Sequence, residues 1–177
     1  MANSEQLEYL QDSADDWKVY RREHAITRPD LRGADLSAAE LPGADLSGAD
    51  LAGADLRAID LTNANLANAD LSGAYLLNVV LSGSNLAGAD LTGANLTEVN
   101  AANANLTDAT LTGAILGGAN LANADLTNAI LHQADLDGAN LTSATLLQAD
   151  LTEANLAGVD LSKADLSWVA GLDSGGT

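Results

Sequence analysis

A five-residue spacing of apolar side chains runs through most of the chain. Leucine recurs every five residues from Leu31 to Leu166, at 27 of 28 such positions, and Ala101 is the single exception. A smaller apolar residue, usually alanine, stands two positions before each of these leucines, and the residue between the two is polar in most repeats. The pentapeptide therefore reads Ala-Asp/Asn-Leu-x-x, in which the last two residues are mostly Ser, Thr, Ala, Gly and Asn.

This period fits neither a helix nor a continuous strand over its full length. On an α-helix each step of five residues advances the side chain by roughly 500°, so the leucines would be distributed all around the axis. In one straight strand, an odd spacing would place successive leucines on opposite faces. A bent chain satisfies the pattern, because Ala-Asp-Leu alternates inward, outward and inward, and the next two residues are of types that turn the chain. The sequence predicts short extended sides that stack into a solenoid with Leu and Ala inside.

The repeat resembles that of the pentapeptide-repeat proteins, whose motif is A(D/N)LXX. Residues 44–48 (ADLSG) and 119–123 (ANLAN) match this motif, and the match extends over roughly residues 29–168. The resemblance implies an all-β solenoid, a right-handed quadrilateral parallel β-helix with four pentapeptides in each coil. With four repeats per coil, the 28 repeats would make about seven coils, each rising about 4.8 Å. The regular leucine-centred repeat is similar to that of cyanobacterial members.

Residues 3–25 do not follow the repeat and show a helical spacing instead. Asn3 or Ser4 is the expected N-cap of this helix. Its apolar face would cover the first coil, which would otherwise expose leucines and unpaired backbone groups. The residues that share this face are Leu7, Leu10, Ala14, Trp17 and Arg21.

The chain therefore divides into an N-terminal helical cap (1–28), the pentapeptide-repeat β-helix (29–168) and a short C-terminal tail (169–177). We expect Trp168, Val169 and Leu172 to fold over the last coil, while the final residues fray. Because this cover is thin, both a monomer and an end-to-end homodimer remain open.

Charge and composition narrow the classes of partner. The chain holds 25 acidic and 7 basic residues, for a net charge of -18, and no cysteine. Such a surface repels nucleic acid and anionic membranes and favours a basic protein partner, such as one that itself binds DNA. Disulfides and thiolate chemistry are excluded. The absence of a long apolar run and of a basic leader segment predicts a cytoplasmic protein without a membrane span.

Catalytic and cofactor-binding residues form no recognisable pattern. The two histidines, His24 and His132, stand apart, and the glycines follow the repeat rather than a phosphate-binding or dinucleotide motif. Asn replaces Asp freely at the middle position, which indicates that a side-chain oxygen bonding a backbone amide matters more there than a charge. We therefore expect no catalytic residue, no cofactor and no metal.

Two sets of outward residues are candidates for binding a protein partner. If residues twenty apart stack, one side carries a column of like charges, which is unfavourable in a sheet and which Asn could have avoided. Drift under selection for solubility also explains this column and is the favoured explanation. The second set consists of apolar residues at outward or corner positions, although scattered apolar residues are also normal on surfaces. The candidates are Asp30, Asp50, Asp70 and Asp90 in the column, and Tyr75, Leu77, Ile115 and Ile130 in the apolar set.

The resemblance implies two functions, neither of them enzymatic. One is a scaffold or protein-binding module, and the other is a DNA mimic that binds DNA gyrase or topoisomerase. Residues 30–166 hold 18 acidic and 3 basic residues. Their net charge of -15 gives one charge per about 2.3 Å of the stack, against one per roughly 1.7 Å in duplex DNA. Gyrase-directed members often have Phe at the central position and a C-terminal dimer element, whereas this chain has no Phe and a short tail. The scaffold is therefore favoured.

Overall fold

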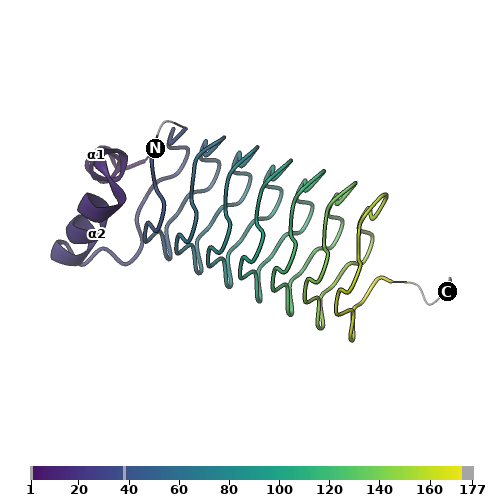
Figure 1. Ribbon diagram of the computed structural model, residues 1–177. Helices are drawn as coiled ribbons and strands as arrows, with labels where there is room; N and C mark the ends of the chain where they lie inside the picture. Colours follow the sequence, from purple (N-terminus) through teal and green to yellow (C-terminus); the bar gives the residue numbers. More distant parts are fainter. Residues whose placement is uncertain (1, 38, 173–177) are drawn as a thin grey trace.

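The computed structural model describes residues 2–37 and 39–172. Two short helices, α1 (Ser4–Asp12) and α2 (Ala14–Glu23), precede a tube of stacked coils that accounts for the rest of the described chain (Figure 1). The helices lie at one end of the tube, and the C-terminus lies at the other. Neither helix in this part of the chain is long and apolar enough to cross a membrane.

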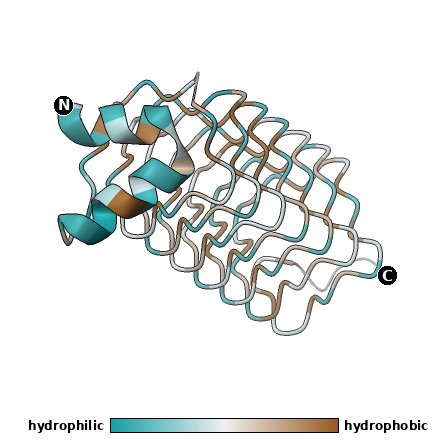
Figure 2. Cartoon of the chain, turned by 60° about the vertical axis from the view of Figure 1, so that its left-hand side comes forward, coloured by the Kyte–Doolittle hydropathy of each residue, from teal (hydrophilic) through white to brown (hydrophobic). Residues whose placement is uncertain are grey.

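The coils are joined by parallel bridges between residues that lie twenty positions apart. The bridges run from Asp30–Asp50 to Asp150–Ala170, and the bridged residue is always the middle one of a pentapeptide. Five residues therefore form one side and four sides form one turn, so the tube is a four-sided parallel β-helix, as the resemblance to pentapeptide-repeat proteins implies. Figure 2 shows this stack from nearer its N-terminal end. We name the sides by their first residues: the Asp30, Asp35, Glu40 and Asp45 sides.

A four-residue turn forms each corner. At the first corner the amide of Ala34 donates to the carbonyl of Leu31 over 3.0 Å. The residue before the alanine has a left-handed backbone, with a φ of 60° at Gly33 and 59° at Asn78. Because this conformation costs least for Gly and Asn, those residue types recur at the last position of the pentapeptide.

Leucine and alanine fill the inside of the tube. The repeat leucines from Leu31 to Leu151 are at most 3% exposed, and Ala101 is 2% exposed in the same inward position. Ser84 is the buried polar residue of this core, and its hydroxyl donates to the carbonyl of Leu81 over 2.7 Å. The inward alternation read from the sequence is confirmed.

The N-terminal segment differs from the single helix that the sequence predicts. Asn3 is the N-cap of α1, since its Oδ1 accepts from the amides of Glu5 and Gln6 at 3.1 Å each. Ser13, with an extended backbone, ends α1 and caps α2. Its hydroxyl oxygen accepts from the amide of Asp16 over 3.0 Å and donates to the carboxylate of the same residue. The expectation of one helix is therefore wrong, because this reciprocal cap starts a second helix.

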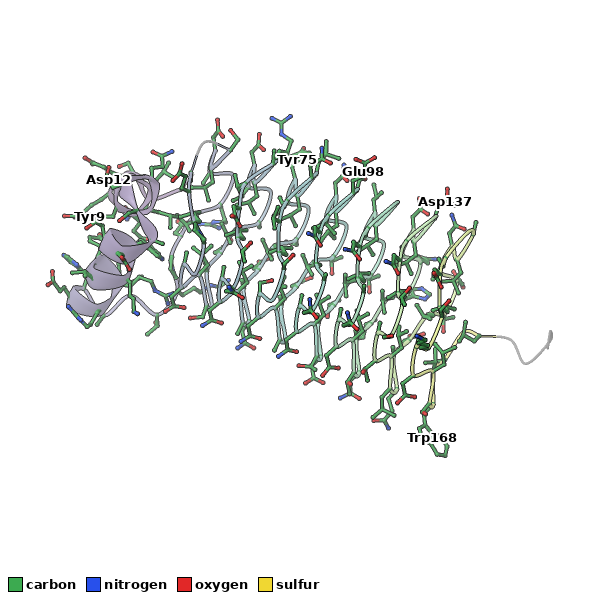
Figure 3. All side chains as sticks on the ribbon, viewed as in Figure 1. Tyr9, Asp12, Tyr75, Glu98, Asp137 and Trp168 are labelled. Carbon is green, nitrogen blue, oxygen red and sulfur yellow. The ribbon has the colours of Figure 1, made fainter. Side chains whose placement is uncertain are left out.

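The C-terminal coil is more exposed than the rest. Leu166 is 37% exposed, and Leu156, Leu161, Val169 and Leu172 are half-buried. Trp168 is 84% exposed and projects from the tube in Figure 3, so the expectation that it folds over the last coil is wrong. It occupies a left-handed corner position, with a φ of 62°, from which side chains point to solvent. Residues 173–177 of the expected tail lie outside the described residues.

Candidate functional site

The middle position of the repeat is polar in 24 of 28 repeats, and the first role of these outward side chains is structural. The Oδ1 of Asp70 accepts from the amide of Ser72 over 3.0 Å, and the Oδ1 of Asn85 accepts in the same way from Ala87 over 3.2 Å. The interpretation that an oxygen rather than a charge is needed here is confirmed for these turns. Where a hydroxyl follows, as at Ser72, it adds a second bond of 2.6 Å to the carboxylate.

The structure brings the four predicted column residues together on the Asp30 side. Asp30, Asp50, Asp70 and Asp90 follow one another in successive bridges. The first two are neutralised within the chain. The Nε of Arg32 lies 3.2 Å from Asp30 and 3.5 Å from Asp50, and its hydrogen bond lowers the pKa of Asp30.

Asp50 is unlike the other members of the column. Arg28 also approaches its Oδ2, at 3.6 Å, and its side chain is only 15% exposed. Its Oδ1 is buried and has no hydrogen-bond partner among the described residues. Asp70 and Asp90 form no ion pair within the described chain, so only this part of the column presents uncompensated charge to a partner.

The apolar candidates divide between two sides. Tyr75 is 55% exposed and Ile115 is 43% exposed, and both bridge to Asn95 on the Asp35 side. Leu77 lies half-buried at the corner that follows Tyr75. Ile130, also exposed, bridges to Thr110 and Asp150 on the Asp30 side and so does not join this group. Figure 3 shows Tyr75 at the outer surface of the tube.

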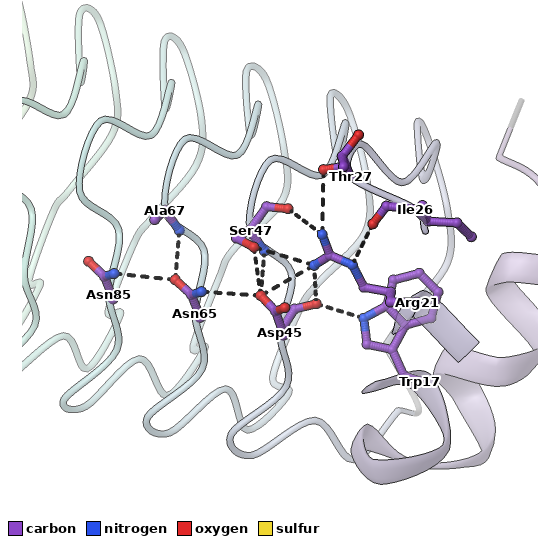
Figure 4. Close-up of polar contacts among 9 residues, drawn as sticks. All are labelled: Trp17, Arg21, Ile26, Thr27, Asp45, Ser47, Asn65, Ala67 and Asn85. Atoms are coloured by element: carbon purple, nitrogen blue, oxygen red, sulfur yellow. Dashed lines mark hydrogen bonds and ion pairs between the residues drawn. The ribbon is translucent and has the colours of Figure 1, made fainter. Parts of the chain in front are cut away.

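The residues that join the helices to the tube were not singled out from the sequence as one polar group. The Nε1 of Trp17 donates to the carbonyl of Asp45 over 2.7 Å, and the guanidinium of Arg21 reaches that carbonyl, the Asp45 carboxylate and Ser47 (Figure 4). Asp45 in turn accepts from the Nδ2 of Asn65 over 3.1 Å. No local pattern marks this group, because its partners are 24 to 28 residues apart.

Two hollows lie beside the helices rather than on the candidate surfaces. One, of about 410 Å³, lies between α2 and the tube, and the other, of about 300 Å³, lies along α1. Within the described part of the chain, no group of three His, Asp or Glu side chains is arranged to hold a metal ion. The first hollow is lined by Lys18, Arg21, Arg22, Ala25, Ile26, Thr27 and Asp45, and the second by Glu5, Glu8, Tyr9 and Asp12.

Solved structures of other proteins are similar to this chain. QnrB1, a plasmid-mediated fluoroquinolone resistance protein, is similar in two trypsin-treated forms. One is 23% identical with a TM-score of 0.64, covering 79% of this chain and 78% of that one. The other is 25% identical with a TM-score of 0.51, covering 77% and 76%. HetL, a pentapeptide repeat protein involved in heterocyst differentiation regulation in the cyanobacterium Nostoc, is 28% identical with a TM-score of 0.36, covering 89% and 97%. No curated protein sequence matches the chain.

The family model for pentapeptide repeats (8 copies) matches residues 30–66, 59–97, 104–142 and 134–169. Proteins of this kind fold as right-handed quadrilateral β-helices, in agreement with the four-sided tube and its twenty-residue register. Because these matches cover well over half of its length, the chain belongs to the pentapeptide-repeat family.

Proposed function

We propose that the chain is a non-enzymatic scaffold that binds a protein partner through outward side chains of its β-helix. The observation that carries this proposal is the exposed phenol of Tyr75, at a position that holds Asp or Asn in 21 of 28 repeats. The stacked neighbours Asp55 and Asn95 both use their side-chain oxygens to hold the turn that follows. Tyr75 cannot do so, and an exposed tyrosine is a common anchor in protein interfaces.

The surroundings of Tyr75 favour a partner with both apolar and basic groups. Ile115 and Leu77 extend the apolar surface along the Asp35 side and its corner. On the neighbouring Asp30 side, Asp70 and Asp90 carry charge that no cation in the described chain offsets. Charge complementarity of this kind steers association and fixes orientation, while apolar anchors supply most of the affinity.

The decisive experiment replaces Tyr75 and Ile115 together by Asn, which the fold already uses at this position. Thr145→Asn, an outward change on the opposite Asp45 side, is the matched control. Proteins retained from the source cell by the immobilised chain are identified, and the affinity of the purified partner is then measured. We expect at least a tenfold loss for the double variant, about 1.4 kcal/mol, and none for the control. Equal affinity for all three chains would refute this surface.

The segments have separate roles in this proposal. Residues 1–28 serve as a helical cap, residues 29–168 form about seven coils that present the binding side chains, and residues 169–177 form a tail. The cap is supported by Leu10 and Trp17, which are both 0% exposed and belong to the same apolar core as the first coil.

A DNA mimic that binds DNA gyrase or topoisomerase, without touching nucleic acid, is the second candidate. Carboxylates from Asp60 to Asp165 lie on all four sides, and the one Lys or Arg in that stretch of sequence is Lys163. The similarity to QnrB1, a fluoroquinolone resistance protein, also supports it. A gyrase supercoiling assay with and without a fluoroquinolone tests it: inhibition or protection would favour the mimic, and no effect at excess protein would leave the scaffold.

Both a monomer and an end-to-end homodimer are compatible with this proposal. The half-exposed leucines of the last coil and the exposed Trp168 would favour the dimer, and the acidic sides would disfavour any lateral association. Light scattering at high protein concentration separates the two states.

A further inference from the structure

The cap occupies the hydrogen-bonding positions of a preceding coil. Inside the tube, the carbonyls of middle residues accept from the amides of inward repeat residues in the coil before them, as Asp50 does from Leu31 over 2.8 Å. The first coil has no such neighbour, and donors of the cap take its place. These donors are the amide of Asn3 to Asp30 (2.8 Å), the Nε2 of Gln11 to Asp35 (3.2 Å) and the Nε1 of Trp17 to Asp45 (2.7 Å).

The replacement extends to a corner carbonyl and to an amide. The Nη2 of Arg21 donates to the carbonyl of Ser47, a corner residue of the first coil, over 3.0 Å. Between coils a backbone amide makes the corresponding bond, as the amide of Gly33 does to the carbonyl of the corner residue Ala52. The Oε1 of Gln6 accepts from the amide of Asp30 over 2.9 Å, the role that a carbonyl has in every later coil. The cap is therefore a substitute coil built from one backbone amide and four side chains.

The opposite end of the tube presents the complementary groups. In the penultimate coil the amides of Leu141 and Leu146 donate to the carbonyls of Asp160 and Asp165 at 2.8 Å each. The equivalent amides of the last coil, at Leu161 and Leu166, have no acceptor among residues 2–37 and 39–172. The two ends of the tube thus present complementary backbone groups in the same register.

We propose that the N-terminal edge of the β-helix is a latent self-association surface that the cap keeps closed. Once the cap is displaced, this edge binds the C-terminal coil of a second copy of the chain. The C-terminal coil fits there because it and the N-terminal edge have the hydrogen-bonding pattern of the same parallel ladder. In this head-to-tail stack the amides of Leu161 and Leu166 donate to the carbonyls of Glu40 and Asp45, and leucine packs on leucine. The same register requires Asp30 of the second copy to replace Ala170 of the first copy as the neighbour of Asp150. This inference is independent of the proposed partner.

Like charges form a second barrier to the stack. The register brings the carboxylate of Asp160 over that of Glu40, and the carboxylate of Asp165 over that of Asp45. Like charges directly opposite in a sheet are destabilising, and salt screens them, since the Debye length falls from about 8 Å at 0.15 M to about 3 Å at 1 M. Displacing the cap should therefore produce assembly mainly at high salt.

The test displaces the cap by replacing Trp17 and Arg21 with Ala in the full chain. The matched control replaces Val19 and Glu23 with Ala, since both are exposed on the same helix and neither is a trypsin site. Mass is measured by light scattering in 0.1 M and 1 M NaCl, and trypsin cleavage within α2 reports displacement of the cap. We expect at least a doubling of mass in 1 M NaCl that grows with concentration for the first variant, and an unchanged mass for the control.

Two further variants make the result decisive. Leu10→Asp, which forces a charge into the buried face of α1, displaces the cap if the first variant does not. Adding Asp160→Asn and Asp165→Asn to a displaced cap should permit assembly in 0.1 M NaCl. The proposal is overturned if a cap that trypsin shows to be displaced leaves the mass unchanged in 1 M NaCl, or if the two Asn changes do not alter the salt dependence.

Discussion

The side-chain amide of Asn85 donates through its Nδ2 to the Oδ1 of Asn65, which lies 3.2 Å away in the preceding coil. The bond repeats from Asn105 to Asn85 over 3.2 Å and from Asn65 to Asp45 over 3.1 Å. All three donors point toward the cap, and the ladder ends on a carboxylate that pairs with Arg21 at 3.2 Å. The carboxylate of Asp45, which can only accept, thus lies at the end of the ladder, the one position that needs no hydrogen-bond donor.

Replacing Asn85 by Asp should therefore destabilise the chain. Its carboxylate has no N–H to give to Asn65 and instead opposes that acceptor, at an expected cost of about 1–2 kcal/mol near neutral pH. Because a protonated carboxyl can donate, the loss should shrink as pH falls. The control is Asn95→Asp, which adds the same charge where the described residues show no ladder bond from the amide nitrogen. Equal shifts of the urea midpoint for the two variants would contradict the role of the ladder.

The central leucines should carry most of the stability. Leu106 is 3% exposed in the middle of the tube, so Leu106→Ala should lower the free energy of unfolding by about 2–5 kcal/mol through lost burial and a cavity. Leu77→Ala, the same change at a half-buried corner, should cost less than about 1 kcal/mol. Thermal or urea unfolding compares the two, and similar losses would show that the inward leucines do not form the main core.

The repeat itself could be predicted from sequence because its interactions are local and recur many times. The inward leucines, the turn after each of them and the side-chain oxygen that holds it all lie within one pentapeptide, as Asp70 and Ser72 show. Because the same pattern recurs in 28 repeats, it strongly favours one interpretation, a stack of short extended sides.

The features that the sequence did not predict depend on contacts or positions that a local sequence pattern does not indicate. The reciprocal cap at Ser13 divides the N-terminal segment, although the apolar spacing continues across it. Arg32 pairs with its near neighbour Asp30, but it and Arg28 reach Asp50 only because the coil brings them together, so half of the predicted column is compensated. Trp168 has an apolar side chain, but its corner position directs it outward.

Two neighbouring corners should respond in opposite directions to exchanging Gly and Ala. Gly53 has a φ of 65°, and a Cβ added there would meet no atom within 4 Å, so Gly53→Ala should cost about 1 kcal/mol from backbone strain alone. Ala58 already bears that strain with a φ of 58°, so Ala58→Gly should be neutral or stabilise by up to about 1 kcal/mol. Melting temperatures that fall for both variants would show that the Ala58 corner is not strained.

Acid should weaken the turns in which a hydroxyl supports a carboxylate. The hydroxyl and amide of Ser167 donate to the Oδ1 of Asp165 over 2.6 Å and 3.0 Å, and the hydroxyl bond in particular lowers the pKa of Asp165 below 3.8. The unfolded chain then takes up this proton more readily than the folded chain. The stabilisation is therefore complete above the ordinary carboxyl pKa and is lost as pH falls through the lower folded value.

Ser167→Ala should raise the pKa of Asp165 toward its ordinary value. It should also reduce the dependence of stability on pH below about 4, because the difference between folded and unfolded proton binding becomes smaller. Ser82→Ala is the matched control, since Ser82 follows Val80 and has no carboxylate in its turn. Carbon-detected NMR titration of the Asp165 carboxyl gives the pKa directly, and acid unfolding of both variants gives the stability. An Asp165 pKa that stays unchanged in Ser167→Ala would assign the lowering to the amide bond instead of the hydroxyl.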